Sequence, residues 1–186
     1  MPNWCSNTLT IQSTEENISK IKTLIEKEKT LLQAIAPIKT QAEDWYSQNI
    51  EHWGTKWDVA IDESHLIFNS NSIHASFSTA WSPPLKACET LLKILRKTDT
   101  TALVKCTFDE PGCDFIGYWK NKEQEIYSIV DLYSKLIDKN PKANSFLKMN
   151  ATYTLKQLAE NFFCTQEDTC RCYNCDASNP IKGYQD

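Results

Sequence analysis

Residues 7–16 read Asn7-Thr8-Leu9-Thr10-Ile11-Gln12-Ser13-Thr14-Glu15-Glu16, a run that passes from the pattern of a strand to that of a helix start. Leu9 and Ile11 alternate with threonines, and this period of two is typical of a half-buried β-strand. Ser13 and Glu16 have the spacing of a capping box, in which both side chains bond backbone amides at the helix N-terminus. We therefore predict a strand over residues 7–12 and a helix from Ser13 to about Thr30.

A second succession of strands and helix follows residue 64. Residues 65–68 and 73–79 have strand patterns, and the polar residues between them suit a tight turn. Ser82 is placed to cap a helix whose first positions are Pro83 and Pro84. Residues 102–108 and 114–119 predict another hairpin, in which Pro111 and Gly112 occupy the positions that a type II turn prefers.

The order of these elements is strand, helix, strand, strand, helix, strand, with one further strand. This order predicts an α+β class, a ferredoxin-like βαββαβ sandwich with an extra strand and a C-terminal helical appendage. Right-handed crossovers predict that the first strand and the 73–79 strand are parallel neighbours, with helices on one face. On that plan Trp53, Trp57 and Trp81 lie near one another at one edge, whereas Trp4 and the Glu110 turn lie at the opposite edge.

The chain divides by pattern into three parts. Residues 1–120 form the predicted ferredoxin-like domain, and its residues 31–62 are an insertion rich in tryptophan with poor periodicity. Residues 121–163 keep a helical period, in which Ile126 is the first apolar position, and predict a helical extension. Residues 164–186 form a tail rich in cysteine. The extension could cover the open face of the sheet or form an oligomer interface, so the oligomeric state stays open.

Four short motifs resemble those of the YubB-type proteins of bacterial plasmids and phages. They are, in order, Met1-Pro2-Asn3-Trp4-Cys5-Ser6-Asn7, Trp53-Gly54-Thr55-Lys56-Trp57-Asp58, Thr79-Ala80-Trp81-Ser82-Pro83-Pro84 and Glu110-Pro111-Gly112. The resemblance covers about residues 1–120. It implies a ferredoxin-like domain and a setting in a mobile element, and it implies no activity and no catalytic residues.

Composition restricts the classes of partner. The chain has 20 basic and 24 acidic residues and a net charge of −4, so it lacks the positive field on which nucleic-acid affinity depends, and nucleic acid is disfavoured as a partner. Its apolar runs are far shorter than a membrane span, and the N-terminus lacks the pattern of a signal peptide. We expect a cytoplasmic protein of a bacterial host, with its eight cysteines reduced.

The aromatic residues beside turn residues are the candidate site. The tryptophans could form a satellite core that pins the 31–62 connection to the sheet. Alternatively they could wall a pocket where a flat ligand such as a nucleobase stacks, with Lys56 facing a phosphate and Asp58 or His52 facing polar edges, or they could form a protein-binding patch. The candidate ligand-binding residues are therefore Trp53, Lys56, Trp57, Asp58, Trp81 and His52.

Evidence for catalysis or metal binding is thinner. The histidines lack metal spacing and no glycine-rich phosphate loop is present, so an enzyme is the less favoured class and no catalytic residue is assigned. Four thiols lie within twelve residues of the tail, a density that suits tetrahedral zinc, although only one pair has the usual Cys-x2-Cys spacing. The candidate zinc ligands are Cys164, Cys170, Cys172 and Cys175, and the alternative is a reduced tail without metal.

These observations predict a non-enzymatic accessory protein of a phage or mobile element. It would bind a host protein or a small ligand through its aromatic edge, and the mobile-element setting suggests a role in counteracting host defence. Two alternatives belong to other classes: a small enzyme that acts on nucleotides, and a structural oligomer stabilised by zinc.

Overall fold

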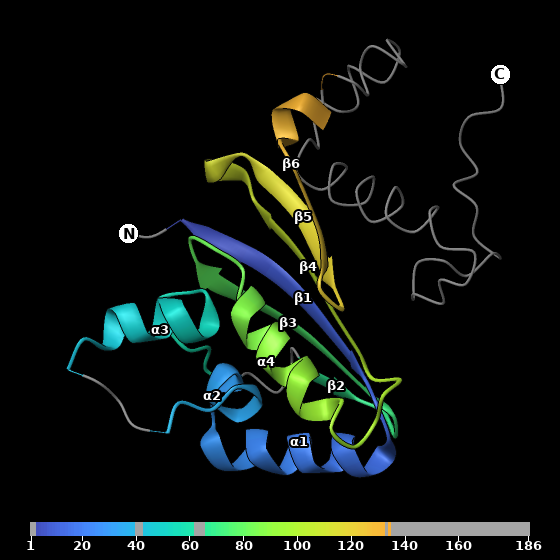
Figure 1. Cartoon of the computed structure of the whole chain (residues 1–186). Helices are drawn as coiled ribbons and strands as arrows, with labels where there is room; N and C mark the ends of the chain where they lie inside the picture. Colours follow the sequence, from blue (N-terminus) through green and yellow to red (C-terminus); the bar gives the residue numbers. More distant parts are fainter. Residues whose placement is uncertain (1–2, 40–42, 62–65, 133, 135–186) are drawn as a thin grey trace, which may run out of the picture. The chain divides into compact units, whose positions relative to one another are not determined.

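The computed structural model describes residues 3–39, 43–61, 66–132 and 134. The contacts divide the chain into two compact units, Met1–Ile129 and Val130–Asp186. The described part of the first unit holds one six-stranded sheet and four α-helices (Figure 1). It is a mixed α and β architecture. The helices predicted beyond residue 134, and the tail with the candidate zinc ligands Cys164, Cys170, Cys172 and Cys175, lie outside the described residues.

The sheet is antiparallel between all neighbouring strands. Its strands are β1 (Trp4–Gln12), β2 (Leu66–Phe68), β3 (Ser72–Ala80), β4 (Leu103–Glu110), β5 (Phe115–Lys120) and β6 (Glu123–Tyr127). Their order in space is β2-β3-β1-β4-β5-β6. Strand β1 is central and pairs with β3 along all nine of its residues, from Trp4 opposite Ala80 to Gln12 opposite Ser72.

The prediction that the first strand and the 73–79 strand are parallel neighbours was wrong. A crossover through a helix makes β1 parallel to the next strand, β2, and not to β3. Because β2 and β3 form an antiparallel hairpin, β3 must run opposite to β1 when it lies between the two. The start of β1 therefore lies beside the ends of β3 and β4.

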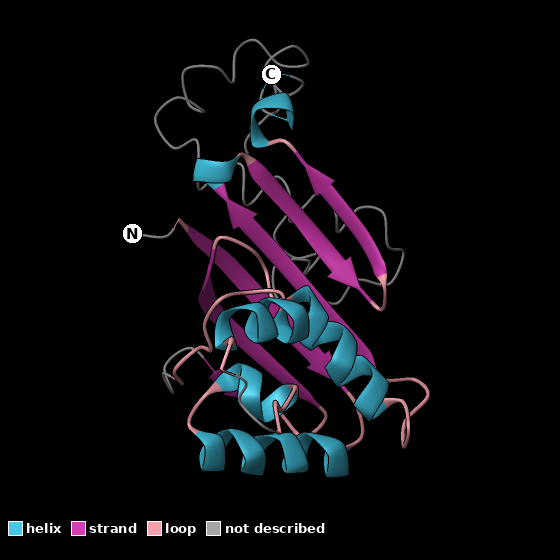
Figure 2. Cartoon of the chain, turned by 60° about the vertical axis from the view of Figure 1, so that its left-hand side comes forward, coloured by secondary structure: helices cyan, strands magenta, loops and turns pink. Residues whose placement is uncertain are grey.

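Helices α1 (Glu15–Glu28), α2 (Leu31–Ile35), α3 (Trp45–Trp53) and α4 (Leu85–Leu95) lie on one face of the sheet (Figure 2). The core lies between these helices and that face. Its largest fully buried side chains include Leu9 and Ile11 of β1, Leu32 of α2 and Leu92 of α4. Helices α2 and α3 fall within the segment whose periodicity was too poor for prediction.

Both predicted helix starts are displaced toward the C-terminus. The Ser13 amide still donates to Asn71 O at 3.1 Å, so the cap of α1 is Thr14, whose hydroxyl accepts from the Asn17 amide. The predicted capping box of Ser13 and Glu16 was therefore wrong. Helix α4 begins at Leu85, after both prolines and without a side-chain cap, because a residue before proline disfavours helical dihedral angles. Ser82 instead donates to Gly54 O at 2.7 Å.

Two connections in the second half of the sheet also differ from prediction. Pro111–Cys113 form a short 3-10 helix, and Asp114, not Gly112, takes the left-handed conformation with φ 56, so the predicted type II turn was wrong. Asn121 and Lys122 both have positive φ and join β5 to β6, as in the tight hairpins that favour such angles. Ile126 consequently lies in a strand, although its spacing predicted a helix, and the sheet extends past the boundary placed near residue 120.

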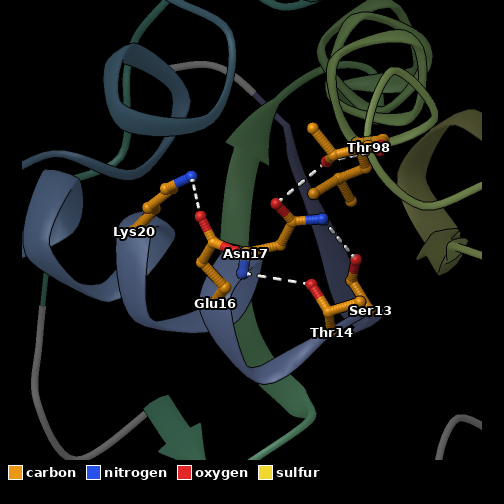
Figure 3. A network of polar contacts seen from close by, with 7 residues as sticks. Ser13, Thr14, Glu16, Asn17, Lys20 and Thr98 are labelled. Atoms are coloured by element: carbon orange, nitrogen blue, oxygen red, sulfur yellow. Dashed lines mark hydrogen bonds and ion pairs between the residues drawn. The ribbon is translucent and has the colours of Figure 1, made fainter.

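A polar network joins the start of α1 to the turn after α4 (Figure 3). Buried Asn17 donates to Ser13 Oγ at 2.9 Å and accepts from Thr98 Oγ1 at 3.1 Å. Ser13 donates in turn to Asp99 Oδ2 at 2.8 Å. Both functional groups of the Asn17 amide are thus bonded, which a buried amide requires.

No helix in the described ranges is long and apolar enough to cross a membrane.

Candidate functional site

Four segments that lie far apart in the sequence meet at one end of the sheet. Trp4 opens β1 opposite Ala80, the last residue of β3, and Ser6 pairs with Asp109 near the end of β4. The Trp81 amide donates to Asn3 O at 2.9 Å, and Asn3 Nδ2 donates to Cys113 Sγ at 3.4 Å. The prediction that Trp4 and the Glu110 turn lie opposite Trp57 and Trp81 was therefore wrong, and its error follows from the parallel pairing that was assumed.

Three tryptophans at this end form a continuous row, which we call the tryptophan array: Trp4, Trp57 and Trp81. The ring centroids of Trp4 and Trp57 are 6.3 Å apart, and those of Trp57 and Trp81 are 6.4 Å apart with the planes inclined at 26°. Their exposed fractions are 53%, 38% and 39%, respectively. A row of indoles that is this exposed is a large apolar surface in contact with water.

The Trp57 ring is positioned by bonds between its loop and the end of β3. Gly54 ends α3 in the left-handed conformation with φ 86 and donates to Ile50 O, as glycine commonly does after a helix. Buried Thr55 donates its hydroxyl to Ala80 O at 3.1 Å. Ser82 Oγ donates to the Gly54 carbonyl. These bonds hold residues 54–57 against the end of β3, beside Trp81.

Trp81 has an unusual backbone conformation. Its φ is 63, in the left-handed region where a bulky residue is a genuine outlier that costs about 1–2 kcal/mol. The turn is held by Thr79, whose hydroxyl donates to Ser82 O at 2.7 Å and accepts from buried Asn7 Nδ2 at 2.8 Å. The chain therefore maintains a strained residue at the point where its indole joins the array, and such strain clusters at functional sites.

Lys56 places a positive charge over the array. Its Nζ lies 4.4 Å from the ring centroid of Trp57, 5.2 Å from that of Trp81 and 5.5 Å from that of Tyr46. An ammonium within about 6 Å of a ring face is attracted by the ring quadrupole. Within the described ranges no carboxylate forms an ion pair with Lys56. Its backbone is held by Asn49, whose Nδ2 donates to Lys56 O at 2.8 Å.

Two of the candidate ligand-binding residues, Trp53 and Asp58, make structural contacts within the fold. Trp53 is 5% exposed, belongs to the hydrophobic core, and donates Nε1 to Ala36 O at 2.8 Å. The Asp58 carboxylate accepts from the amides of Leu32 at 2.7 Å and Gln33 at 3.0 Å, at the start of α2. Trp53 is thus part of the main hydrophobic core, whereas Trp57 and Trp81 are 38% and 39% exposed. His52 is exposed near the C-terminal end of α3.

An acidic cluster lies beside Asn3 at the end of β4. Glu110 is 3% exposed, and its Oε1 accepts from the Gly112 amide at 2.9 Å. Its Oε2 is buried and has no hydrogen-bond partner among the residues described. Burial and the nearby carboxylates of Asp109 and Glu110 raise the pKa of the Cys5 thiol to about 12. Cys113 is exposed, and its sulfur accepts from Asn3 Nδ2.

Sequence reasoning missed Trp4, Asn3 and Tyr46 as members of this site. Trp4 lies at the start of the first strand and Trp81 directly follows the 73–79 strand, so antiparallel pairing of the two strands would have brought them together. Tyr46 carries no such signal, because α3 was not predicted. Of the other histidines, His74 lies on β3 and contacts Thr10 Oγ1 at 3.3 Å, and His65 is outside the described residues.

Comparisons with protein-family models, with curated proteins and with solved structures find no match for this chain.

Proposed function

We propose that this protein is a non-enzymatic binding protein whose ligand-binding surface is the tryptophan array with Lys56. The observation that carries the proposal is the contiguous contact of three exposed indoles from three separate segments. Hydrophobic burial favours removing such a surface from water by about 25 cal/mol per Å². Tryptophan is also enriched among the residues that dominate binding energy at interfaces.

The strain at Trp81 supports the same proposal. A left-handed tryptophan weakens the fold, whereas a glycine at this position would not. Retaining the tryptophan makes physical sense when the indole contributes to binding. The backbone bond from Trp81 to Asn3, and the bond from the Thr55 hydroxyl to Ala80 O, keep the array in place without a ligand, so binding would require little reorganisation.

The proposed setting is an accessory role in a phage or plasmid, with a host protein or a small ligand as partner. The YubB-type resemblance suggests this setting, and a role in counteracting host defence would be consistent with it. We also propose a ferredoxin-like fold for residues 1–120. The order β2-β3-β1-β4 of the first four strands, with α1 and α4 as the two crossovers, supports that assignment.

The alternative of a nucleotide enzyme is weakened by the position of Asp58. Its carboxylate oxygens accept from three backbone amides, those of Leu32, Gln33 and Val59. A carboxylate used in this way stabilises a helix start and is poorly placed to exchange a proton with a ligand.

Native mass spectrometry of the full chain tests the proposal. The protein is purified from a bacterial cytosol without chelator and compared with a denatured sample. We expect a bound molecule or protein partner that is lost from the double variant Trp57→Ala/Trp81→Ala, while the circular dichroism spectrum is retained. The same spectra test the predicted zinc site, which would add one zinc mass per chain. Wild-type protein that carries no partner, or a partner retained by the double variant, would contradict the proposal.

Trp53→Ala is the matched control for a structural effect. Because Trp53 is buried and hydrogen-bonded, its removal should lower the free energy of unfolding by about 3–5 kcal/mol. Replacing the exposed residues Trp57 and Trp81 should lower the free energy of unfolding far less. If the double variant unfolds as Trp53→Ala does, the array is part of the core and is not a binding surface.

A further inference from the structure

We propose that the ligand of the array is a mononucleotide, whose flat base stacks on the indoles and whose phosphate pairs with Lys56. This inference rests on the proposed function and names the chemical class of its ligand. Three observations carry it: a lysine with no counter-charge among the described residues, indoles that are 38–53% exposed, and a net charge that disfavours long nucleic acids.

The charge of Lys56 favours an anion. Its ammonium contacts three aromatic rings, which fix its place above the array but do not neutralise it. Among the described residues, Lys20 pairs with Glu16 and Lys93 with Glu89, whereas Lys22 lies over the Phe68 ring as Lys56 lies over the array. An anionic group of a ligand would give Lys56 the charge-assisted contact that no described carboxylate provides.

The arrangement of the indoles favours a flat ring. The centroids are 6.3 and 6.4 Å apart with planes inclined at 37° and 26°, and the three indoles cover one another only in part, because they remain 38–53% exposed. The exposed remainder can stack with a planar heteroaromatic ring. Stacking of a nucleobase on an aromatic side chain tolerates any base identity, because every base has a π-face.

The charge distribution favours a mononucleotide over a polynucleotide. A strand of DNA or RNA is bound through several phosphates, each facing a cation. The array has Lys56 above it, with buried Glu110 and Asp109 beside Asn3 at the same sheet end, and the chain has a net charge of −4. One phosphate beside one lysine matches this site, whereas a run of phosphates would lie in the negative field of the chain.

Isothermal titration calorimetry with the full chain tests the ligand class. The probes are AMP, GMP, CMP and UMP, the corresponding nucleosides, ribose 5-phosphate, and a ten-nucleotide single strand. We expect the mononucleotides to bind more tightly than the nucleosides, and ribose 5-phosphate to bind least. Absence of binding by all four mononucleotides at millimolar concentration would overturn the proposal. Tighter binding of the oligonucleotide than of any mononucleotide would overturn it in favour of a strand.

Two variants separate the roles of charge and stacking. Lys56→Met should weaken mononucleotide binding by about tenfold or more, to the level of the nucleoside, and leave nucleoside binding unchanged. Trp57→Ala should weaken both ligands by about tenfold or more. Lys20→Met removes the same charge from α1 and should change neither. If Lys56→Met and Lys20→Met weakened binding equally, the phosphate would be responding to the charge of the whole chain and not to contact with Lys56. That result would overturn the proposal.

The two proposals fail in different ways. If mononucleotides do not bind but a partner seen by mass spectrometry still depends on Trp57 and Trp81, only the nucleotide assignment falls. If neither experiment shows a ligand that depends on the array, the proposed function falls as well.

Discussion

At the scale of single residues, the array contains a tryptophan, Trp81, in a left-handed backbone conformation that is unfavourable for a bulky side chain. Trp81 has φ 63 and is held by the Asn3 carbonyl and by the bonded pair Thr79 and Ser82. Trp53 and Trp57 are four residues apart, yet Trp53 is buried and Trp57 is exposed, because Gly54 turns the chain between them. Residue type therefore does not decide which indole is buried, and local backbone geometry does.

Replacement of Trp81 separates strain from function. Trp81→Gly and Trp81→Ala both remove the indole, but only glycine adopts a positive φ without steric cost. We expect Trp81→Gly to be more stable than Trp81→Ala by about 1 kcal/mol in urea unfolding, with ligand binding lost from both. Equal stabilities would show that the left-handed backbone is not strained.

Cysteine reactivity provides a second prediction at this scale. Burial first, and then Asp109, raise the pKa of Cys5 to about 12, and the side-chain hydrogen bond with Cys88 and burial raise that of Cys106. Thiols of high pKa hold little thiolate at pH 8. Iodoacetamide should therefore modify exposed Cys113 in the folded protein and leave Cys5 and Cys106 intact, as measured by peptide mass mapping. A sample unfolded in urea should react at all three, and early modification of Cys5 in the folded protein would contradict its burial.

At the scale of elements, the sequence predicted five of the strands and the two long helices, because each has a clear period and turn residues at its ends. It did not predict β6, since the connecting residues Asn121-Lys122 lack the glycine by which hairpin turns are usually identified. Helix α2 spans only Leu31–Ile35 and depends on the Asp58 side chain for its cap. A contact from 26 residues away cannot be inferred from local periodicity.

The network between α1 and α4 predicts a pH effect. Hydrogen bonds from Thr101 and Ser13 hold the pKa of Asp99 below its ordinary value of 3.8. A lowered folded pKa means that ionised Asp99 stabilises the fold above pH 3.8, and that this contribution is lost as the pH falls through the folded pKa. Asp99→Asn should therefore be less stable than wild type at pH 7, and the difference should shrink near pH 3. Urea unfolding at both pH values measures it, and a difference that is equal at the two would exclude the linkage.

The pairing of β5 with β6 depends on Gly117. A Cβ at this position would lie 2.3 Å from Glu125 O and 3.0 Å from Phe108 Cε2, too close for either strand to keep its place. Gly117→Ala should lower the free energy of unfolding by about 1–3 kcal/mol, as overpacking does, in urea unfolding. In Gly112→Ala the new Cβ meets the end of the Asn3 side chain at 2.9 Å, which can move, so the cost should be smaller. If Gly112→Ala destabilised the protein more than Gly117→Ala, close packing of β6 against β5 would be contradicted.

At the scale of the whole molecule, one error of topology accounts for most of what sequence reasoning missed in the site. The membership of Lys56, Trp57 and Trp81 was predicted from their turn-rich surroundings. Trp4 was assigned to the far edge because the first strand and the 73–79 strand were taken as parallel, whereas the observed register sets Trp4 opposite Ala80. The neighbouring position of the two strands was predicted, and their antiparallel direction follows because β1 is parallel to β2 and the hairpin reverses β3.

The same register would allow proteins of low overall sequence similarity to share this surface. Its members come from Asn3-Trp4, Lys56-Trp57, Trp81 and Cys113, and the intervening chain only has to return to the same sheet end. Loops between these segments can lengthen or shorten, and core residues can be exchanged for others of similar volume, without moving the indoles. Two proteins could therefore share this surface with identical residues at only a handful of scattered positions, and a spaced pattern of short segments would identify them better than overall similarity does.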